Sequence, residues 1–487
     1  MINFIPLGGA NDIGASCYYL NIEGTGIILD SGTHPRKFGV DSLPQFDFIK
    51  DMNVDVALIS HAHQDHIDSL PYLVQRHPYI RIVTTPQTRA VAEITLHNSV
   101  NILQEQLKDE LKIRAYTHEE IDLLIQSIEW RAYEEQFTLN GYRHSSNEPI
   151  KASFHDAGHI LGSAGTLLEH KGRTIFYTGD INLDKQSLLS GAQLPKQKVD
   201  VLILECTHGA TDSEQLPTRI EEQTRFAQCA NKILSRGGSI LIPVFALGKM
   251  QEMLSTVWKM MQKGSLATTD IYTGGVGKKI SSVYDKNRYT VPYNDTDLIL
   301  SEIPQKDLYD IEHIDDLLRK QCIVLAGSGM IIENTLSYKL TQRWLSQPKF
   351  GIFTVGYMDP ETPGYRVRHS HKGSLIQLTN TSEPQNVSCD VEQFRFSAHS
   401  NREGILSIVQ QLNPSTVILV HGEHGSIDWM GYSIMKKFPQ QNPHLRNAQD
   451  YQRALRASVL SSIAIEGVKK AAERAIKNST SKVMKHD

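Results

Sequence analysis

The sequence predicts an α/β protein with two lobes, of which the first is interrupted by the second and completed after it. Residues 1–208 alternate short apolar segments with turns and histidine-rich loops, which is typical of strands. From about Thr211 to Val391, helical and apolar segments alternate as in an open α/β sheet. At about Phe394 the histidine-bearing strand pattern returns. A chain of 487 residues is also too long for one ordinary core.

The first lobe is expected to consist mostly of strands. Residues 67–76 carry a helical pattern, and residues 88–135 are expected to be mostly helical. Apolar runs between turns predict strands at 2–9, 16–22, 25–32, 54–60, 81–85, 151–158, 164–170, 173–179 and 199–205.

The second lobe is expected to alternate helices with buried strands. Its helices are predicted at Glu214–Ser235, Lys249–Gln262 and Met330–Trp344, and its strands at 239–245, 322–327 and 350–356. We assign 1–208 to the first part of the first lobe, 209–393 to the inserted lobe and 394–453 to the completion, with strands at 394–400 and 416–421. Residues 454–487 are expected to form a C-terminal helix with a basic tail.

Composition excludes several classes of protein. The net charge of −4 gives no global basic signal, so any contact with nucleic acid must come from a local groove or from metal ions. No apolar run reaches the ~20 residues that span a bilayer, and the first residues do not resemble a signal peptide. The five cysteines are far apart and form no CxxC pair, which argues against disulfides and thiolate zinc sites. These features predict a cytoplasmic protein without a membrane partner.

The strongest local signal is the hexapeptide HAHQDH at residues 61–66. His61, His63, Asp65 and His66 are imidazole and carboxylate groups of the kind that zinc prefers, and a two-metal site needs several of them on one wall. They follow the predicted buried strand at 54–60, so they should point into a cleft rather than a core.

Three further residues strengthen the metal hypothesis. His159, Asp180 and His421 each lie beside an apolar strand and next to a glycine, which lets the backbone approach a metal or a phosphate closely. A single histidine of this kind is usually a packed core or surface group, but three in this order favour a shared site.

Together these motifs resemble the metallo-β-lactamase superfamily. HxHxDH, GH, TGD and a late histidine, with Asp30 upstream in ILDSG, are similar to its metal motifs. The segments ILECTHG, PVFALGKMQEML, GSGM, FSAHSNREG and LVHGE resemble its β-CASP branch of nucleases, over about residues 4–425. The likeness is greatest to the group that includes the endonuclease subunit of the cleavage and polyadenylation factor and its prokaryotic relatives. It implies an αββα sandwich with an inserted α/β β-CASP domain.

The resemblance also implies a set of metal ligands. His61, His63 and His159 would hold one Zn²⁺, Asp65, His66 and His421 the second, and Asp180 would bridge the two. Asp30 would orient a ligand from behind, as metal-bound histidines usually require. Histidine and carboxylate sites also accept Mn²⁺. The late histidine at position 421 resembles members that act on RNA rather than on DNA.

These residue types permit phosphodiester hydrolysis. Two zinc ions ~3.5–4 Å apart can supply a hydroxide nucleophile near neutral pH, with Asp65 among its supporting groups, and can stabilise charge on the phosphate. We assign the proton donor for the leaving oxygen to His399, held by Glu205.

Phosphate contacts are less clearly indicated. Ser328 and Gly329 lie between a strand and the helix expected from Met330, where free backbone N–H groups favour an anion, although a plain turn explains them equally well. Arg402, close after His399, is a second candidate, and Lys249 is a third.

Several positions depart from the β-CASP pattern near the expected substrate cleft. His208 occupies a place where an aromatic residue is common, and Ser400 and Asn401 follow FSAH where an acidic residue is frequent. The segments IIENT after GSGM and GYMDPETPGYRV around Gly364 also differ. All of the implied metal ligands are present.

Four functions therefore compete. The favoured one is a single-stranded RNA endonuclease, with 5′-to-3′ exonuclease activity as an additional mode. The alternatives are a DNA-directed nuclease in repair or defence, a non-catalytic scaffold of an RNA-processing complex, and a small-molecule hydrolase. A homodimer, or a partner protein in RNA processing or defence, would be compatible with each nuclease hypothesis.

Overall fold

The computed structural model describes residues 2–37, 39–106, 116–141, 148–214 and 216–438. The first lobe contains two six-stranded sheets. In the first sheet, three antiparallel strands continue into parallel ones. Its strands, in spatial order, are β1 (Ile2–Gly8), β2 (Cys17–Ile22), β3 (Thr25–Leu29), β4 (Val56–Leu58), β5 (Arg81–Thr84) and β6 (Glu129–Trp130).

The second sheet is completed by a strand that comes from far along the chain. Its strands, in spatial order, are β20 (Thr416–Val420), β11 (Val201–Glu205), β10 (Arg173–Tyr177), β9 (Ala164–His170), β8 (Ile150–Asp156) and β7 (Phe137–Leu139). β20 pairs with β11 in parallel, with Glu205 opposite Val420. The residues that follow these two strands therefore emerge side by side.

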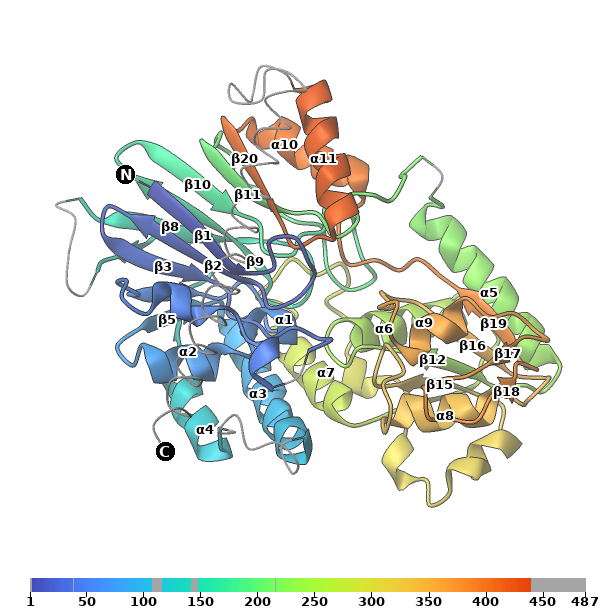
Figure 1. The fold of residues 1–487 in the computed structure, drawn as a ribbon. Coiled ribbons are helices and arrows are strands. Elements are labelled where there is room, and N and C mark those ends of the chain that lie inside the picture. The colour runs from blue at the N-terminus through green and yellow to red at the C-terminus, as the bar shows by residue number, and fades with distance from the viewer. Residues whose placement is uncertain (1, 38, 107–115, 142–147, 215, 439–487) are drawn as a thin grey trace, which may run out of the picture.

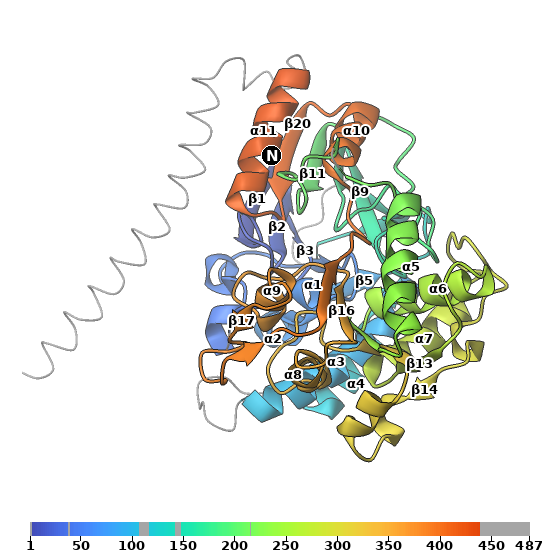
Figure 2. The same cartoon turned by 90° about the vertical axis from the view of Figure 1, so that its right-hand side faces the viewer.

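The two sheets pack face to face and helices cover their outer faces. Ile27 and Leu58 of the first sheet join Phe154 and Ile203 of the second in one buried cluster. The helices beside the first sheet are α1 (Gln64–Ile67), α2 (Leu70–Arg76), α3 (Pro86–Gln106) and α4 (His118–Ser127), and those beside the second are α10 (Arg402–Leu412) and α11 (His424–Lys437). In both views the two groups of helices lie on opposite outer sides of the sandwich (Figure 1, Figure 2). The predicted αββα arrangement is confirmed.

The second lobe is a parallel sheet with helices on both faces. Its strands, in spatial order, are β14 (Lys306–Asp307), β13 (Asp270–Thr273), β15 (Cys322–Ala326), β12 (Ile240–Pro243), β16 (Gly351–Thr354) and β19 (Asp390–Gln393). α5 (Arg219–Ser235), α6 (Lys249–Gln262) and α7 (Val276–Asn287) cover one face, and α8 (Leu336–Trp344) and α9 (Pro363–Arg368) the other. Alternate strand residues enable this: Ile240 and Ile242 face one layer and Leu241 the other. β17 (Leu375–Ile376) and β18 (Gln385–Asn386) form a separate hairpin.

The two lobes meet through the loop that connects β10 to β11. The Glu252 carboxylate on α6 accepts hydrogen bonds from the backbone N–H groups of Ser187 and Leu188. Leu189 forms an isolated β-bridge with Tyr293, which belongs to the second lobe. Because these bonds are between buried or partly buried groups, they fix the second lobe against the sandwich.

Helix starts were predicted less accurately than helix interiors. The prediction for α6 is confirmed at both ends, whereas α5 begins at Arg219 rather than Glu214 and α8 at Leu336 rather than Met330. In both corrected cases a threonine just before the helix accepts a hydrogen bond from the first turn, and this cap sets the start. The helical prediction to Glu135 is too long, because α4 ends at Ser127 and β6 follows.

Three other expectations need correction. Asp65 and His66 lie in the short helix α1 rather than in a loop. The strand predicted at 394–400 is wrong, because β19 ends at Gln393, pairs with β16 in the second lobe and leads into a connecting segment. α10 and α11 were not predicted. The division of the chain at 208 and 393 stays a prediction, and the predicted tail at 454–487 lies outside the described residues. Within the described ranges, no helix combines the length and apolarity needed to cross a membrane.

The contact between the lobes can be tested with Glu252→Ala. The change leaves two backbone donors and the Arg219 guanidinium, which also pairs with Glu252, without their carboxylate. We expect a loss of about 3–5 kcal/mol in the free energy of unfolding, measured by chemical denaturation. Asp315→Ala removes an ion pair with Arg343 that is exposed on both sides and should leave stability unchanged. Equal effects of the two substitutions would contradict this account of the lobe contact.

Candidate metal centre

The predicted metal ligands converge on one end of the sandwich. His61 and His63 follow β4, Asp180 follows β10, and His421 follows β20. His159 lies in the turn between β8 and β9. β4, β10 and β20 therefore all present their carboxyl ends at this point, beside the second lobe, and loops at such ends position side chains for binding.

One group of ligand atoms belongs to His61, His63, His159 and Asp180, and all of these atoms lie within 4.8 Å of one another. The His63 Nδ1 atom is 3.1 Å from the Nε2 atoms of both His61 and His159. The Asp180 Oδ2 atom is 3.6 Å from His61 Nε2 and 3.7 Å from His159 Nε2. Three imidazoles and a carboxylate in this arrangement can hold one metal ion.

A second group consists of Asp65, His66 and His421, again with ligand atoms within 4.8 Å. The His421 Nε2 atom is 3.2 Å from Asp65 Oδ2 and 3.3 Å from His66 Nε2. The Asp180 Oδ1 atom is 3.3 Å from nitrogens of both His66 and His421. The Asp180 carboxylate thus turns one oxygen toward each group.

The environment of Asp180 fits a bridging role. Its Oδ1 atom is buried and, among the described residues, makes no well-aligned hydrogen bond, although the His66 and His421 nitrogens lie 3.3 Å away. A metal ion between these groups would compensate the buried charge. The preceding Gly179 has φ +54°, and a Cβ atom there would lie 2.7 Å from the Ser60 Cβ atom. Glycine therefore allows the chain to bring Asp180 against the loop that carries the histidines.

Asp30 holds this loop from behind. Its carboxylate accepts hydrogen bonds from His66 Nδ1 at 2.8 Å, the Ser60 hydroxyl at 2.7 Å and the Tyr177 hydroxyl at 2.6 Å. The bond to His66 leaves the Nε2 atom of that ring facing the other ligands. Asp30 thus orients His66, a member of the second ligand group, from the side of the ring that faces away from the other ligands.

The other histidines are oriented in the same way. The Nδ1 atom of His159 donates to the Ala398 carbonyl at 2.7 Å, and the Nδ1 atom of His421 lies 3.0 Å from the Thr207 hydroxyl. Sequence reasoning did not identify Thr207. Its signal was its position two residues after Glu205, just beyond the end of β11, beside the strand that ends next to His421.

Electrostatics favour metal binding over an uncharged site. Burial lowers the pKa values of His61 and His159 well below the ordinary value, so these rings are neutral and available as ligands. Burial opposes charge on His66 too, but Asp180 and Asp65 outweigh it and raise its pKa well above the ordinary value. Burial would raise the pKa of Asp180, yet the nearby histidines, His421 first, hold it well below its usual range. The carboxylates therefore stay ionised and require cations.

His399 and Glu205 form a separate acid–base pair next to these ligands. The His399 Nδ1 atom is 3.0 Å from Glu205 Oε1, and the His399 ring centroid is 4.5 Å from that of His159. The Glu205 carboxylate also accepts the backbone N–H groups of Ile181 and Thr207. One ligand atom each of Glu205, His399 and Asp180 also lies within 4.8 Å of the other two. The Glu205 oxygens, however, already accept these two backbone N–H groups, which argues against a third metal site here.

Charge coupling keeps the pair ionised. Burial is the largest single effect and favours neutral groups, but the charge and hydrogen bond of the partner together with neighbouring charges outweigh it. The pKa of His399 is therefore raised and the pKa of Glu205 is lowered. His399 retains a 19% exposed side chain, so its proton is accessible from the solvent side. An accessible imidazolium next to a metal site is suited to general-acid chemistry.

The predicted phosphate loop lies at the carboxyl edge of the sheet in the second lobe but does not begin a helix. Ser328 and Gly329 follow β15, and a Cβ atom on Gly329 would come within 2.9 Å of the Phe245 backbone nitrogen. The Ser337 hydroxyl donates to the Ser328 carbonyl at 2.8 Å. Since α8 begins only at Leu336, the helix-dipole argument for this phosphate site is wrong. A role for Ser328 and Gly329 in binding stays a prediction.

Arg402 and Lys249 are engaged by the protein itself. The Arg402 guanidinium donates to the Gly209 and Ala210 carbonyls and lies 3.4 Å over the Trp429 ring. Lys249 is buried and its ammonium donates to the Phe396 carbonyl. These contacts argue against both residues as phosphate ligands. Burial, with a smaller effect from a nearby arginine, also lowers the pKa of Lys249 to about 7.

His208 is closer to the site than its sequence position indicated. Its Nε2 atom is 3.1 Å from the Ser397 hydroxyl, and its ring stands edge-on to His399 at 5.8 Å. Burial lowers the pKa of His208 to about 4, so this ring is neutral. It supports the turn before His399 rather than supplying charge.

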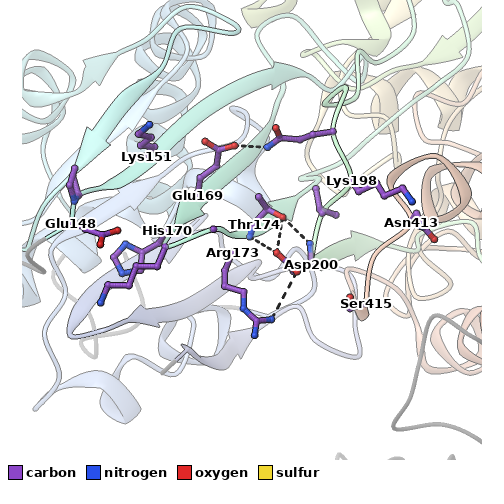
Figure 3. A pocket seen from close by; sticks show the side chains of 15 residues that line it. Glu148, Lys151, Glu169, His170, Arg173, Thr174, Lys198, Asp200, Asn413 and Ser415 are labelled. Carbon is purple, nitrogen blue, oxygen red and sulfur yellow. Dashed lines mark hydrogen bonds and ion pairs between the residues drawn. The ribbon is translucent and has the colours of Figure 1, made fainter.

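A pocket of about 740 Å³ lies where β9 leads into β10, at the end of these strands that is far from the metal centre (Figure 3). None of the predicted site residues lines it. Charges within it are largely satisfied: Asp200 accepts from Thr174, and Glu169 accepts from Gln197. The size of this pocket therefore does not mark the site of chemistry.

Comparison with known families assigns three successive parts of the chain. Residues 19–205 match the metallo-beta-lactamase superfamily domain, residues 250–367 the Beta-Casp domain, and residues 384–442 the Zn-dependent metallo-hydrolase RNA specificity domain. A crystal structure of a protein of unknown function from Enterococcus faecalis V583 has the same fold, with a TM-score of 0.51 and 12% identity over 86% of this chain and 93% of that one.

Curated relatives match most of this chain. Cleavage and polyadenylation specificity factor subunit 3 of Dictyostelium discoideum is 31% identical over 91% of this chain and 56% of its own length. Cleavage and polyadenylation specificity factor 73 of Drosophila melanogaster is 30% identical over 90% of this chain and 62% of its own length. Endoribonuclease ysh1 of Schizosaccharomyces pombe is 29% identical over 90% of this chain and 56% of its own length. This chain thus spans little more than half the length of these relatives. With the three domain models in order and a His/Asp cluster able to bind metal at their junction, the chain belongs to the β-CASP branch of the metallo-β-lactamase superfamily.

Proposed function

We propose that this protein is a zinc-dependent ribonuclease that cuts RNA phosphodiester bonds internally. The observation that carries the proposal is the position of Asp180 between two complete ligand groups, with the His399–Glu205 pair beside them. Two features of the comparisons support RNA as substrate: the RNA specificity domain at 384–442 and a relative named as an endoribonuclease.

The donor set fits two zinc ions. His61, His63 and His159 would hold one ion, and Asp65, His66 and His421 the other, with Asp180 shared. Mn²⁺ would also fit imidazole and carboxylate ligands. When bound, the ions supply Lewis-acid stabilisation of the phosphate and an activated water.

His399 acts as the proton donor in this proposal. Its Nδ1 atom faces Glu205, which leaves the Nε2 atom to protonate the oxygen that leaves the phosphorus. Glu205 fixes the ring and favours its charged form, and is itself fixed by two backbone N–H groups. The neutral His208 and the Ser397 hydroxyl hold the adjoining turn.

We further propose that the protein works within an RNA-processing complex. The relative from Dictyostelium discoideum supports this, since it is named as subunit 3 of a cleavage and polyadenylation specificity factor. Action on single strands, an exonuclease mode, self-association and a cytoplasmic location stay predictions.

The assignment of the bridging carboxylate predicts metal content. Asp180→Ala should lower bound zinc from two ions per chain to fewer than one, because both ligand groups lose an oxygen. The measurement is elemental analysis of purified protein after dialysis. His371→Ala, an exposed histidine in the second lobe, should retain both ions. Full zinc occupancy in the Asp180 variant would contradict the bridging role.

The activity itself can be tested with single-stranded RNA and DNA labelled at either end. The wild-type protein should make internal cuts in RNA, and His399→Ala should cut about 10²–10⁴-fold more slowly with its zinc retained. Stepwise products from the 5′ end would indicate an exonuclease instead. Cleavage of DNA alone, or of neither substrate by the zinc-loaded protein, would refute the ribonuclease proposal.

The pH dependence reports on the acid–base pair. The donor must be protonated, so kcat should fall as the pH rises through the pKa of His399, which lies above the ordinary value of ~6.5. Glu205→Gln removes the partner charge, lowers this pKa and should move the alkaline limb to lower pH. Glu403→Gln makes the same charge change at an exposed pair with Lys437 and should leave the profile in place. An unmoved alkaline limb in Glu205→Gln would rule out His399 as its origin.

A further inference from the structure

The connecting segment 396–399 makes contacts with both lobes and with the metal centre. Each of its residues takes part in a hydrogen bond with a residue far away in the sequence. The pairs are the Phe396 carbonyl with Lys249 Nζ, the Ser397 hydroxyl with His208 Nε2, the Ala398 carbonyl with His159 Nδ1, and His399 Nδ1 with Glu205 Oε1. The position of the His399 ring therefore depends on a short backbone segment that is neither helix nor strand.

Lys249 makes the contact at the start of this segment. It is the first residue of α6 and its exposure is only 9%. In the described ranges, no carboxylate lies within ion-pair distance of the Lys249 ammonium. The ammonium donates a hydrogen bond to the Phe396 carbonyl instead. The Arg219 guanidinium lies 5.6 Å over the Phe396 ring. Phe396 is thus held through its backbone by one cation and through its ring by another.

The turn before Lys249 also touches the metal ligands. The Leu247 carbonyl lies 3.5 Å from His63 Nε2. One turn of the second lobe therefore contacts a metal ligand and, two residues later, the segment that carries His399. A buried ammonium without a carboxylate costs stability relative to an apolar side chain of similar length. The property that lysine adds at this position is a donor for the Phe396 carbonyl.

We propose that Lys249 is a positioning residue for His399: its ammonium fixes the Phe396 carbonyl and thereby the place of the His399 ring beside Asp180. The inference rests on the proposed function, because it takes His399 as the proton donor. It also replaces the phosphate-binding role that the sequence suggested for Lys249.

The same helix supplies a matched control. Lys259, ten residues further along α6, donates from Nζ to the Ser187 carbonyl at 3.1 Å and pairs with Asp295 at 3.1 Å. Both lysines therefore bond a backbone carbonyl outside the inserted sheet from one helix. They differ in the acceptor: the segment that contains Phe396 leads to His399, whereas Ser187 lies in the loop between β10 and β11.

The test compares Lys249→Met and Lys259→Met in the full-length chain, each alone and combined with His399→Ala. Steady-state cleavage of single-stranded RNA gives kcat and KM, elemental analysis gives zinc content, and hydrogen–deuterium exchange gives the protection of residues 394–400. Methionine keeps the length of lysine and removes the donor. Thermal unfolding of each variant shows that it is folded.

Lys249→Met should lower kcat by about 10-fold or more, because small displacements of a catalytic group are costly, with KM and zinc unchanged. In the His399→Ala background the same substitution should change kcat by less than about 2-fold, since a positioning effect disappears with its target. Residues 394–400 should exchange faster in Lys249→Met alone. Lys259→Met should keep the wild-type kcat and exchange.

Other results would overturn the inference. A raised KM at unchanged kcat would make Lys249 a substrate contact. An equal loss of kcat in Lys259→Met would mean that Lys249 contributes only to the general docking of the lobes. Loss of zinc in Lys249→Met would mean that Lys249 acts through His159. If the wild-type protein cuts no RNA, the proposed function fails. Hydrogen–deuterium exchange still decides whether Lys249 holds the connecting segment. Unchanged exchange rates at residues 394–400 in Lys249→Met would show that it does not.

Discussion

Buried carboxylates at the junction of the two lobes are the constraint on which the structure depends. Asp30 is fully buried, and Asp180 is 3% exposed. Ionised groups in such places are tolerated only with cations or a full set of hydrogen bonds. Asp30 has its hydrogen bonds from Ser60, His66 and Tyr177. One Asp180 oxygen makes no well-aligned hydrogen bond among the described residues and has only two imidazole nitrogens at 3.3 Å beside it. The fold thus supplies hydrogen bonds to Asp30, which orients a ligand, and leaves Asp180, which the two ligand groups share, for metal ions.

This constraint explains why the chain leaves the sandwich and returns to it. His421 reaches the site only because β20 pairs with β11 after the whole inserted lobe has been built. The return path passes through residues 394–401, and His159 uses the Ala398 carbonyl of that path to orient its ring. The inserted lobe therefore supplies part of the structure that sets the ligand geometry. Its docking through Glu252 and the β-bridge at Leu189 keeps the two halves of the site in register.

Sequence patterns predicted the residues that meet at the site better than the contacts that those residues make. Most ligand positions could be read because they lie in the turns that follow apolar strands, and strand ends of both sheets of the sandwich meet at one edge. Asp65 and His66 lie on α1, which follows the same strand as His61. The contacts of Arg402 and Lys249 argue against the phosphate roles predicted for them, because local sequence does not reveal which way a long side chain turns. One stacks on Trp429 and the other bonds Phe396, both distant in sequence. The predicted strand at 394–400 is absent for another reason: its pattern alternates, but β16 ends at Thr354, opposite Gln393, so the residues that follow have no strand of that sheet beside them.

Charge at the site also resolves the conflict between a net charge of −4 and a polyanionic substrate. Without metal, the ionised carboxylates of Asp65, Asp180 and Glu205 face imidazoles whose pKa values are raised at His66, His399 and His421, so charge is roughly balanced. Divalent ions in the two ligand groups would displace the protons of His66 and His421 and make the site locally positive. Attraction for a phosphodiester is then tied to metal occupancy rather than to a basic surface. Under the proposed function, a chain with no global excess of lysine and arginine would in this way attract its substrate at the metal centre rather than over its whole surface.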